Sequence, residues 1–526
     1  MTPGAQARAV TASSQRRSSG AWARRLELRL TQARRGAAWF LAFAAVILAV
    51  AGCSARGPAG ALVVTQTPAV AGPTNRADDL LDLRYPAGSR LVLVRPPFRP
   101  DDTRLLSRGL VAAGGPVICP GGKRVFFVGK AAKGGTWQVY QAKLGGGRPE
   151  LLTAMVGGAM DPAIIATGEL VFSSPVPGVP GREAATPGQA TRAPSALYVQ
   201  GADRKPRRLT FGAEAAVAPT VLRDGRILFV SARSSSGARG TPQLGLFTVN
   251  NDGTEVTAFA LDHDGAPRVE RPREFADGRI GFLAAAAGAP PGDCWAECVQ
   301  RSRPFASRTN LFAFPPASCR SVEPDGEGGL LACLRVPSPA GRGMPGSFAV
   351  YRVGAAAAEP GEPLFDEPGW DEVEAAALSE RPTPAGHVST IVPGKKTGLI
   401  LCLNANFSRR AGDTSKAAAT AERVRVLAGQ GPGAECSLGE VPLQADGSFM
   451  AEVPADTPLG FESVDRDGRV VQRVAPSLWV RPGENRSCIG CHEPYNRSPG
   501  NVRPLAAALP PVNLCPPART LARQAR

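Results

Sequence analysis

Histidine and aromatic side chains are scarce in this sequence. It has three histidines among 526 residues, and Phe, Trp and Tyr together make up 6%. Three histidines offer little material for hydrolytic metal chemistry, and no Ser/His/Asp grouping, phosphate-binding loop or pair of catalytic carboxylates stands out. These absences argue against a hydrolase.

Basic charge is plentiful, but it is not gathered with aromatic residues. The formal net charge is +16, and residues 1–52 hold eight arginines against one acid, Glu27. The other basic residues are scattered, without the runs of Lys and Arg interleaved with aromatics that line a nucleic-acid groove. We therefore expect no nucleic-acid partner.

An apolar stretch near the N-terminus predicts export. The uncharged residues Gly36–Gly52 follow a basic leader, and Val50-Ala51-Gly52-Cys53 resembles a bacterial lipobox. We interpret 1–52 as a lipoprotein signal peptide and Cys53 as the lipidated N-terminus; the alternative is an uncleaved anchor. Either way we expect a cell-envelope protein, lipid-anchored to the membrane and facing the periplasm, with the outer membrane as one option.

Glycine (60 residues) and proline (50) are abundant, which favours short strands and turns and predicts an all-β fold. A turn containing glycine, followed by a short apolar strand, recurs at intervals typical of four-stranded blades. The turn glycines are Gly88, Gly122, Gly168, Gly225, Gly278 and Gly326. With the phrases "RPELLT" and "RKPRRLT", these repeats resemble TolB-like blades, so we predict a β-propeller of about six blades over 78–375, after a linker at 53–77. An irregular set of β-sandwiches is the alternative.

The pattern of predicted strands changes after a second linker at 376–396. Longer alternating strands and the hairpin turns Asp446-Gly447 and Asp467-Gly468 predict a small antiparallel β-sandwich over 397–500, followed by a C-terminal tail at 501–526.

The sandwich ends on Cys488-Ile-Gly-Cys491-His492. Two thiols at this spacing suit covalent haem attachment, half of a zinc site, or a reducible disulfide. Export favours the haem among these three. The adjacent histidine agrees with it, because it would face the iron of a haem bound to the two thiols. Apart from Cys53 and the two cysteines of the motif, the sequence has eight cysteines, an even number that is compatible with structural disulfides. We consider local pairing for Cys294/Cys298, Cys319/Cys333 and Cys402/Cys436.

The motif and the residues before it resemble a known family. The string Asp446-Gly-Ser-Phe449, Val453-Pro-Ala-Asp-Thr-Pro458, Trp479-Val-Arg-Pro-Gly-Glu484 and Cys488-Ile-Gly-Cys-His-Glu493 is similar to the middle domain of hydrazine synthase alpha-subunit-like proteins. The resemblance implies one covalent haem c on Cys488 and Cys491, with His492 as a ligand of the haem iron. In the synthase a tyrosine after the motif is associated with the iron, and the motif histidine with zinc, so Tyr495 is a further candidate. No second motif follows in this sequence, so we do not expect hydrazine synthesis itself.

The sixth position of the iron separates the functions that we consider. Met450 is our candidate distal ligand, because a thioether suits electron transfer; His387 and an open site are the alternatives. We expect Trp479 to pack near the haem or in an ordinary core.

Our first hypothesis is an exported monohaem c-type cytochrome-like lipoprotein for electron transfer, whose propeller docks a redox partner protein. The alternative is a haem-dependent oxidoreductase that acts on a small compound, such as a nitrogen compound, and is related to the hydrazine synthase alpha subunit. A propeller scaffold with a vestigial haem is the third hypothesis.

Overall fold

The computed structural model describes residues 60–69, 84–177, 194–233, 243–260, 268–286, 289, 293–314, 318–336, 346–354, 357–407, 420–429, 435–490 and 500–515. The chain divides into two compact units, Met1–Arg56 and Gly57–Arg526, and every described residue belongs to the second. The predicted signal peptide, Cys53, Cys491, His492 and Tyr495 lie outside the described residues.

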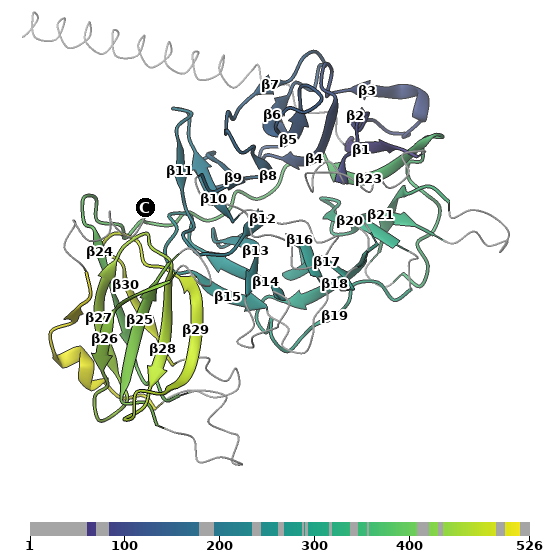
Figure 1. Cartoon of the computed structure of the whole chain (residues 1–526). Coiled ribbons are helices and arrows are strands. Elements are labelled where there is room, and N and C mark those ends of the chain that lie inside the picture. Colours follow the sequence, from purple (N-terminus) through teal and green to yellow (C-terminus); the bar gives the residue numbers. More distant parts are fainter. Residues whose placement is uncertain are drawn as a thin grey trace, which may run out of the picture. The chain divides into compact units, whose positions relative to one another are not determined.

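The described elements are β-strands, with short 3₁₀ helices at Pro100–Asp102 and Leu505–Ala508, so the all-β prediction is confirmed. Six antiparallel sheets are consistent with the blades of the predicted propeller, and Figure 1 shows them arranged in a ring. The first sheets are β23(Trp370–Ala377)-β1(Leu62–Pro68)-β2(Arg90–Val94)-β3(Thr103–Leu105), β4(Ala112–Ile118)-β5(Val125–Lys130)-β6(Gln138–Ala142)-β7(Glu150–Leu151) and β8(Met160–Ile164)-β9(Leu170–Pro175)-β10(Ser195–Gln200)-β11(Pro206–Arg208). The others are β12(Ala216–Val221)-β13(Ile227–Arg233)-β14(Gln243–Val249)-β15(Thr257–Ala260), β16(Arg268–Glu274)-β17(Arg279–Ala285)-β18(Trp295–Gln300)-β19(Thr309–Asn310) and β20(Ser318–Pro324)-β21(Leu330–Arg335)-β22(Ala349–Val353).

The glycine turns lie where the repeats predict them. Each predicted apolar strand is the second strand of its sequence-ordered blade, for example β13 after Gly225 and β17 after Gly278. Both glycines have positive φ, +88° and +83°, which L-residues with a side chain rarely adopt.

Strand β1 lies inside 53–77, which we predicted to be a linker. It pairs with β23 from the other end of the propeller, so that Val64 faces Ala375 across the closing blade. Strand β1 also pairs with β2, but it has no hairpin turn to β23, because these two strands are about 300 residues apart in sequence. That separation explains why the repeat pattern missed it.

A buried charged cluster lies inside the propeller, among strands whose pairing contains register shifts. Glu374 of β23 accepts hydrogen bonds from Thr65 Oγ1 (2.8 Å), the Gly115 backbone N–H (2.6 Å) and Tyr85, and it pairs with Arg271. Burial raises the pKa of the Glu374 carboxyl, but Arg271 and these side-chain hydrogen bonds outweigh it, so the pKa lies below its ordinary value. The cluster ties β1, β4, β16 and β23 together.

The sandwich consists of two four-stranded sheets, which Figure 1 labels from β24 to β30. Buried side chains such as Ile400, Val426 and Phe449 form its core. The two sheets are β30(Asn485–Cys488)-β24(Thr397–Cys402)-β27(Phe449–Pro454)-β31(Val512–Asn513) and β26(Cys436–Pro442)-β25(Arg423–Ala428)-β28(Leu459–Val464)-β29(Val470–Leu478). Two features differ from the prediction: β30 and β31 pair in parallel with their neighbours, and β31 comes from the predicted tail.

The strands separate two of the cysteine pairs that we considered. Cys294 precedes β18 and Cys298 lies on it, four residues further along an extended chain. Cys319 belongs to the core that contains Leu334, whereas Cys333 belongs to the core that contains Leu331. The Cys319 backbone N–H instead donates to the Cys294 carbonyl at 2.8 Å.

Glu372, beside this cluster on β23, generates a prediction about pH. It is fully buried, and burial raises the pKa of its carboxyl to about 8 despite a 2.9 Å hydrogen bond from Gln66 Nε2. The protonated form therefore favours folding, and that stability is lost as pH rises from the ordinary pKa through about 8. In Glu372→Gln we expect this loss, roughly 1.4 kcal/mol per pH unit at most, to disappear.

The measurement is the free energy of unfolding between pH 5 and 9, from urea titrations. Glu362→Gln, which changes an exposed carboxylate, is the matched control. Identical pH slopes for the parent protein and Glu372→Gln would contradict the prediction.

Candidate functional site

The cysteine motif begins on a strand at the edge of a sandwich sheet. Strand β30 runs parallel to β24, with Arg486 beside Ile400 and Cys488 beside Cys402. The pairing continues past the strand, since Leu403 N donates to the Cys488 carbonyl (2.9 Å) and Asn404 N to the Ile489 carbonyl (3.2 Å). Backbone hydrogen bonds therefore fix the first half of the motif.

Gly490, between the two motif cysteines, lies in a confined space. A Cβ atom at this position would be 2.2 Å from the Phe407 carbonyl oxygen and 3.1 Å from that of Asn404. Any side chain here would push the chain away from the β24 extension. The glycine therefore allows the motif to lie against this backbone, while the preceding Ile489 side chain is 42% exposed.

The segment that leads into β30 docks on the propeller turn between β14 and β15. Trp479 is 3% exposed, packs in a propeller core with Phe229, Phe247 and Val256, and donates from Nε1 to the Gly253 carbonyl at 2.9 Å. We expected Trp479 near the haem or in an ordinary core. The structure agrees with the second alternative, and the core is that of the propeller.

Two charged residues extend this docking. Arg481 Nη1 donates to the Asp252 carbonyl at 2.9 Å, and Glu484 accepts from the backbone N–H groups of Glu255 (2.9 Å) and Arg481 (2.7 Å). Burial raises the pKa of the Glu484 carboxyl despite these two hydrogen bonds. A Cβ on Gly253 would be 2.3 Å from Arg481 Nη1, so this turn needs glycine for close approach as well as for its φ of +88°. We call Trp479–Arg486 the docking segment.

Arg486 completes the docking segment. It is 9% exposed, and its Nη2 donates to the Val256 carbonyl. Its Nε and Nη1 atoms are buried and have no hydrogen-bond partner in the part of the chain that the structure describes. Sequence reasoning missed this residue; the available signal was an arginine two positions before Cys488, on the same face of a strand.

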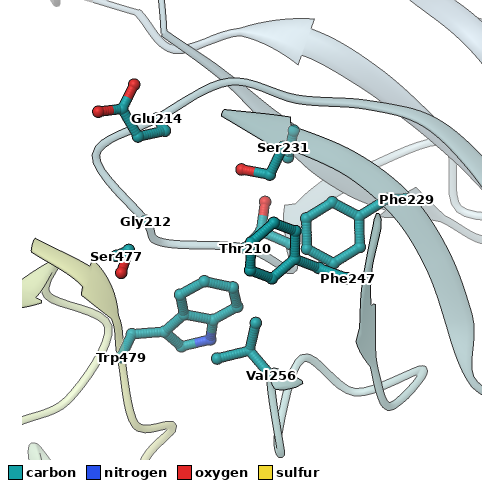
Figure 2. Close-up of a pocket in the computed structure, with 10 residues that line it drawn as sticks. Thr210, Gly212, Glu214, Phe229, Ser231, Phe247, Val256, Ser477 and Trp479 are labelled. Carbon is teal, nitrogen blue, oxygen red and sulfur yellow. The ribbon is translucent and has the colours of Figure 1, made fainter. Parts of the chain in front are cut away.

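A small pocket lies beside Trp479, and Figure 2 shows its indole next to Val256 and below Thr210. Its interior of about 20 Å³ holds roughly one water molecule and excludes an organic substrate. The pocket is lined by Thr210, Gly212, Glu214, Ala216, Phe229, Ser231, Phe247, Val256, Ser477 and Trp479.

The two distal-ligand candidates belong to other segments than Cys488. Met450 pairs with Leu401, one position before the Cys402 level, so its side chain leaves the sheet on the face opposite to that of Cys402 and Cys488. His387 lies with its Nε2 3.7 Å from Asp252 Oδ2, which also accepts from Ser389 Oγ at 2.8 Å. Neither candidate is tested as an iron ligand, and both stay predictions.

Within the described ranges, no group of three or more His, Cys, Asp or Glu side chains could hold a metal ion. Among the same residues, no helix is long and apolar enough to cross a membrane.

Comparisons with known proteins agree with this architecture of propeller and sandwich. Residues 400–493 match the family described as hydrazine synthase alpha subunit middle domain. The structure is similar to that of Kuenenia stuttgartiensis hydrazine synthase, with a TM-score of 0.72 and 18% identity over 86% of this chain and 72% of that chain. TolB from Acinetobacter baumannii gives a TM-score of 0.38 and 13% identity over 59% of this chain and 65% of that one. No curated protein matches the sequence.

The middle-domain resemblance predicted from the sequence is thereby confirmed over 400–493. At 18% identity, the likeness to the solved synthase shows a shared fold.

Removing the Trp479 side chain tests the docking segment. We expect Trp479→Ala to lower the free energy of unfolding by about 3–5 kcal/mol, because a buried indole leaves a cavity and an unpaired Gly253 carbonyl. The linker at 376–396 should also become more sensitive to protease. Trp479→Phe also lacks the indole N–H but keeps most of the apolar area, so it should cost less; equal losses in the two variants would contradict the anchoring role of the buried ring.

Adding a methyl group at Gly490 tests the motif's confinement. We expect Gly490→Ala to destabilise the protein by about 1–3 kcal/mol, because the new Cβ would overlap the Phe407 carbonyl. Gly500→Ala is the control, since its Cβ would meet its nearest atom, Val502 Cγ2, at an ordinary 3.7 Å. Urea unfolding of both variants is the measurement, and equal stabilities would show that Gly490 is not confined.

Proposed function

We propose that this protein is a haem-dependent oxidoreductase acting on a small compound, related to the hydrazine synthase alpha subunit. One haem c is attached through Cys488 and Cys491, and His492 binds the haem iron. The observation that carries the proposal is the docked strand β30, which fixes Cys488 within the segment that matches the synthase middle domain.

The described residues fit such a cofactor. Cys488 is half-buried at the edge of a sheet, at the margin of the sandwich core. Gly490 lets the spacer between the two cysteines lie flat against the Asn404 and Phe407 carbonyls. Arg486, on the same strand, has two buried nitrogens to offer a negatively charged group.

When bound, haem supplies an iron that exchanges electrons and can take up a small ligand. The chain's own part is to orient the group. Backbone hydrogen bonds along β24 hold Cys488 and Ile489, and the buried Trp479 ring anchors the docking segment on the propeller turn. Glu484 stiffens the approach to the motif because it binds a backbone N–H on each side of the contact.

Our first hypothesis was electron transfer with Met450 closing the iron site. The face that Met450 occupies gives that reading no support, and the comparisons favour a relative of an enzyme subunit. We therefore propose an iron site that is open to a small molecule, such as a nitrogen compound.

The cellular setting is proposed from the sequence. Lipidation at Cys53 would attach the protein to the membrane in the cell envelope, facing the periplasm, where a redox partner protein exchanges electrons with the haem. Attachment of haem c to both thiols requires export of the protein, which agrees with a location in the cell envelope.

Replacing both motif cysteines tests the cofactor. In the parent protein, haem should remain on the chain in a denaturing gel, because thioether bonds survive unfolding. The Cys488→Ser/Cys491→Ser variant should lose the haem stain entirely. Cys436→Ser/Cys515→Ser, which changes two half-buried cysteines of the sandwich, is the matched control and should keep it.

Haem that persists in the motif variant would place the attachment elsewhere. Zinc without haem in the parent protein would favour a zinc site. A parent protein that contains neither haem nor zinc would favour a disulfide.

A further inference from the structure

Two arginines of the docking segment have buried nitrogens without a hydrogen bond, but Arg481 Nε lies 2.8 Å from Asp456 Oδ1, whereas no ion pair is found for Arg486 among the described residues. Nη2 donates to the Val256 carbonyl, whereas Nε and Nη1 have no partner among the described residues. Glu484, the nearby carboxylate, accepts from the backbone N–H groups of Glu255 and Arg481. Glu484 therefore forms no hydrogen bond with the two remaining nitrogens, although it is close enough for its charge to interact with that of Arg486.

Two buried donors on a cation are costly to leave without a partner. A guanidinium keeps its charge in any protein environment, so it cannot avoid the cost by losing a proton. A neutral carbonyl such as that of Val256 compensates part of the lost hydration. A carboxylate is the group that best compensates such a donor, because its hydrogen bond to a guanidinium is charge-assisted; Nε and Nη1 point in different directions, so one carboxylate pairs with one of them.

The position of Arg486 indicates which anion this is. Arg486 and Cys488 are two residues apart on one strand, so their side chains leave the same face, about 7 Å apart along the backbone. Their partners on β24, Ile400 and Cys402, are both in the sandwich core, and the intervening Ser487 is exposed. A haem attached at Cys488 thus starts on the face from which Arg486 projects.

We propose that Arg486 binds a carboxylate of the haem, namely one of its propionate groups. This inference rests on the proposed function, because it requires a haem at Cys488. Strand β30 then holds the cofactor twice, by a thioether at Cys488 and by an ion pair at Arg486. Since Arg486 is also bonded to Val256, the propeller turn contributes to the placement of the haem.

The test compares full-length Arg486→Gln and Arg486→Lys with the parent protein. Three properties are measured: haem stain on a denaturing gel, reduction potential by spectroelectrochemistry, and the propionate bending band in the resonance Raman spectrum. Arg473→Gln is the control, because its guanidinium already pairs with Glu462 (2.7 Å) and Glu435 (2.8 Å).

We expect both Arg486 variants to keep covalent haem. Arg486→Gln should lower the potential, because the propionate charge is no longer neutralised and stabilises ferric iron. Arg486→Lys should lower the reduction potential less, since the charge remains but the hydrogen-bonding geometry of the guanidinium is lost. The propionate band should shift in both variants and stay in place in Arg473→Gln.

Haem-loaded Arg486→Gln with the parent's potential and propionate band would overturn the inference and leave the proposed function standing. If Arg486→Gln does not fold, an unshifted band in Arg486→Lys overturns it equally. Absence of haem from the parent protein would overturn both proposals.

Discussion

The contact between the docking segment and the turn at Asp252–Val256 is the constraint on which the rest of this site depends. Trp479 lies in the propeller core, Arg481 and Glu484 exchange hydrogen bonds with the turn, and Arg486 binds Val256. Two residues later the chain reaches Cys488. A flexible tether would leave the motif free to take many positions, whereas these buried contacts fix the direction from which it starts.

The local parts of this architecture could be predicted from the sequence, and the long-range parts could not. Glycine turns such as Gly225 and Gly278 are specified by neighbouring residues, so the second strand of each blade was found. Strand β1 was missed because its partner β23 lies at the far end of the propeller. Strand β31 was missed because a two-residue strand has no pattern of its own.

The candidate site follows the same division. Cys488 was singled out by its spacing to Cys491 and His492, which is a local signal. The roles of Trp479 and Arg486 arise from contacts with residues more than 200 positions away, and no periodicity in the sequence marks them. For Met450, the hydrophobic alternation of β27 contained the useful signal: Phe449 and Ala451 are buried, so Met450 between them lies on the other face.

That face bears on the choice between electron transfer and small-molecule chemistry. A distal ligand from the strand interior would close the iron site, and the register of β24 and β27 places Met450 away from the motif side. We therefore predict an iron that a small ligand can reach. The most direct measurement is the visible absorption spectrum of the reduced full-length protein before and after carbon monoxide is added. We predict a c-type haem spectrum that changes on binding of carbon monoxide; a haem spectrum that stays the same would mean a closed site, and the absence of haem absorption would contradict the account altogether.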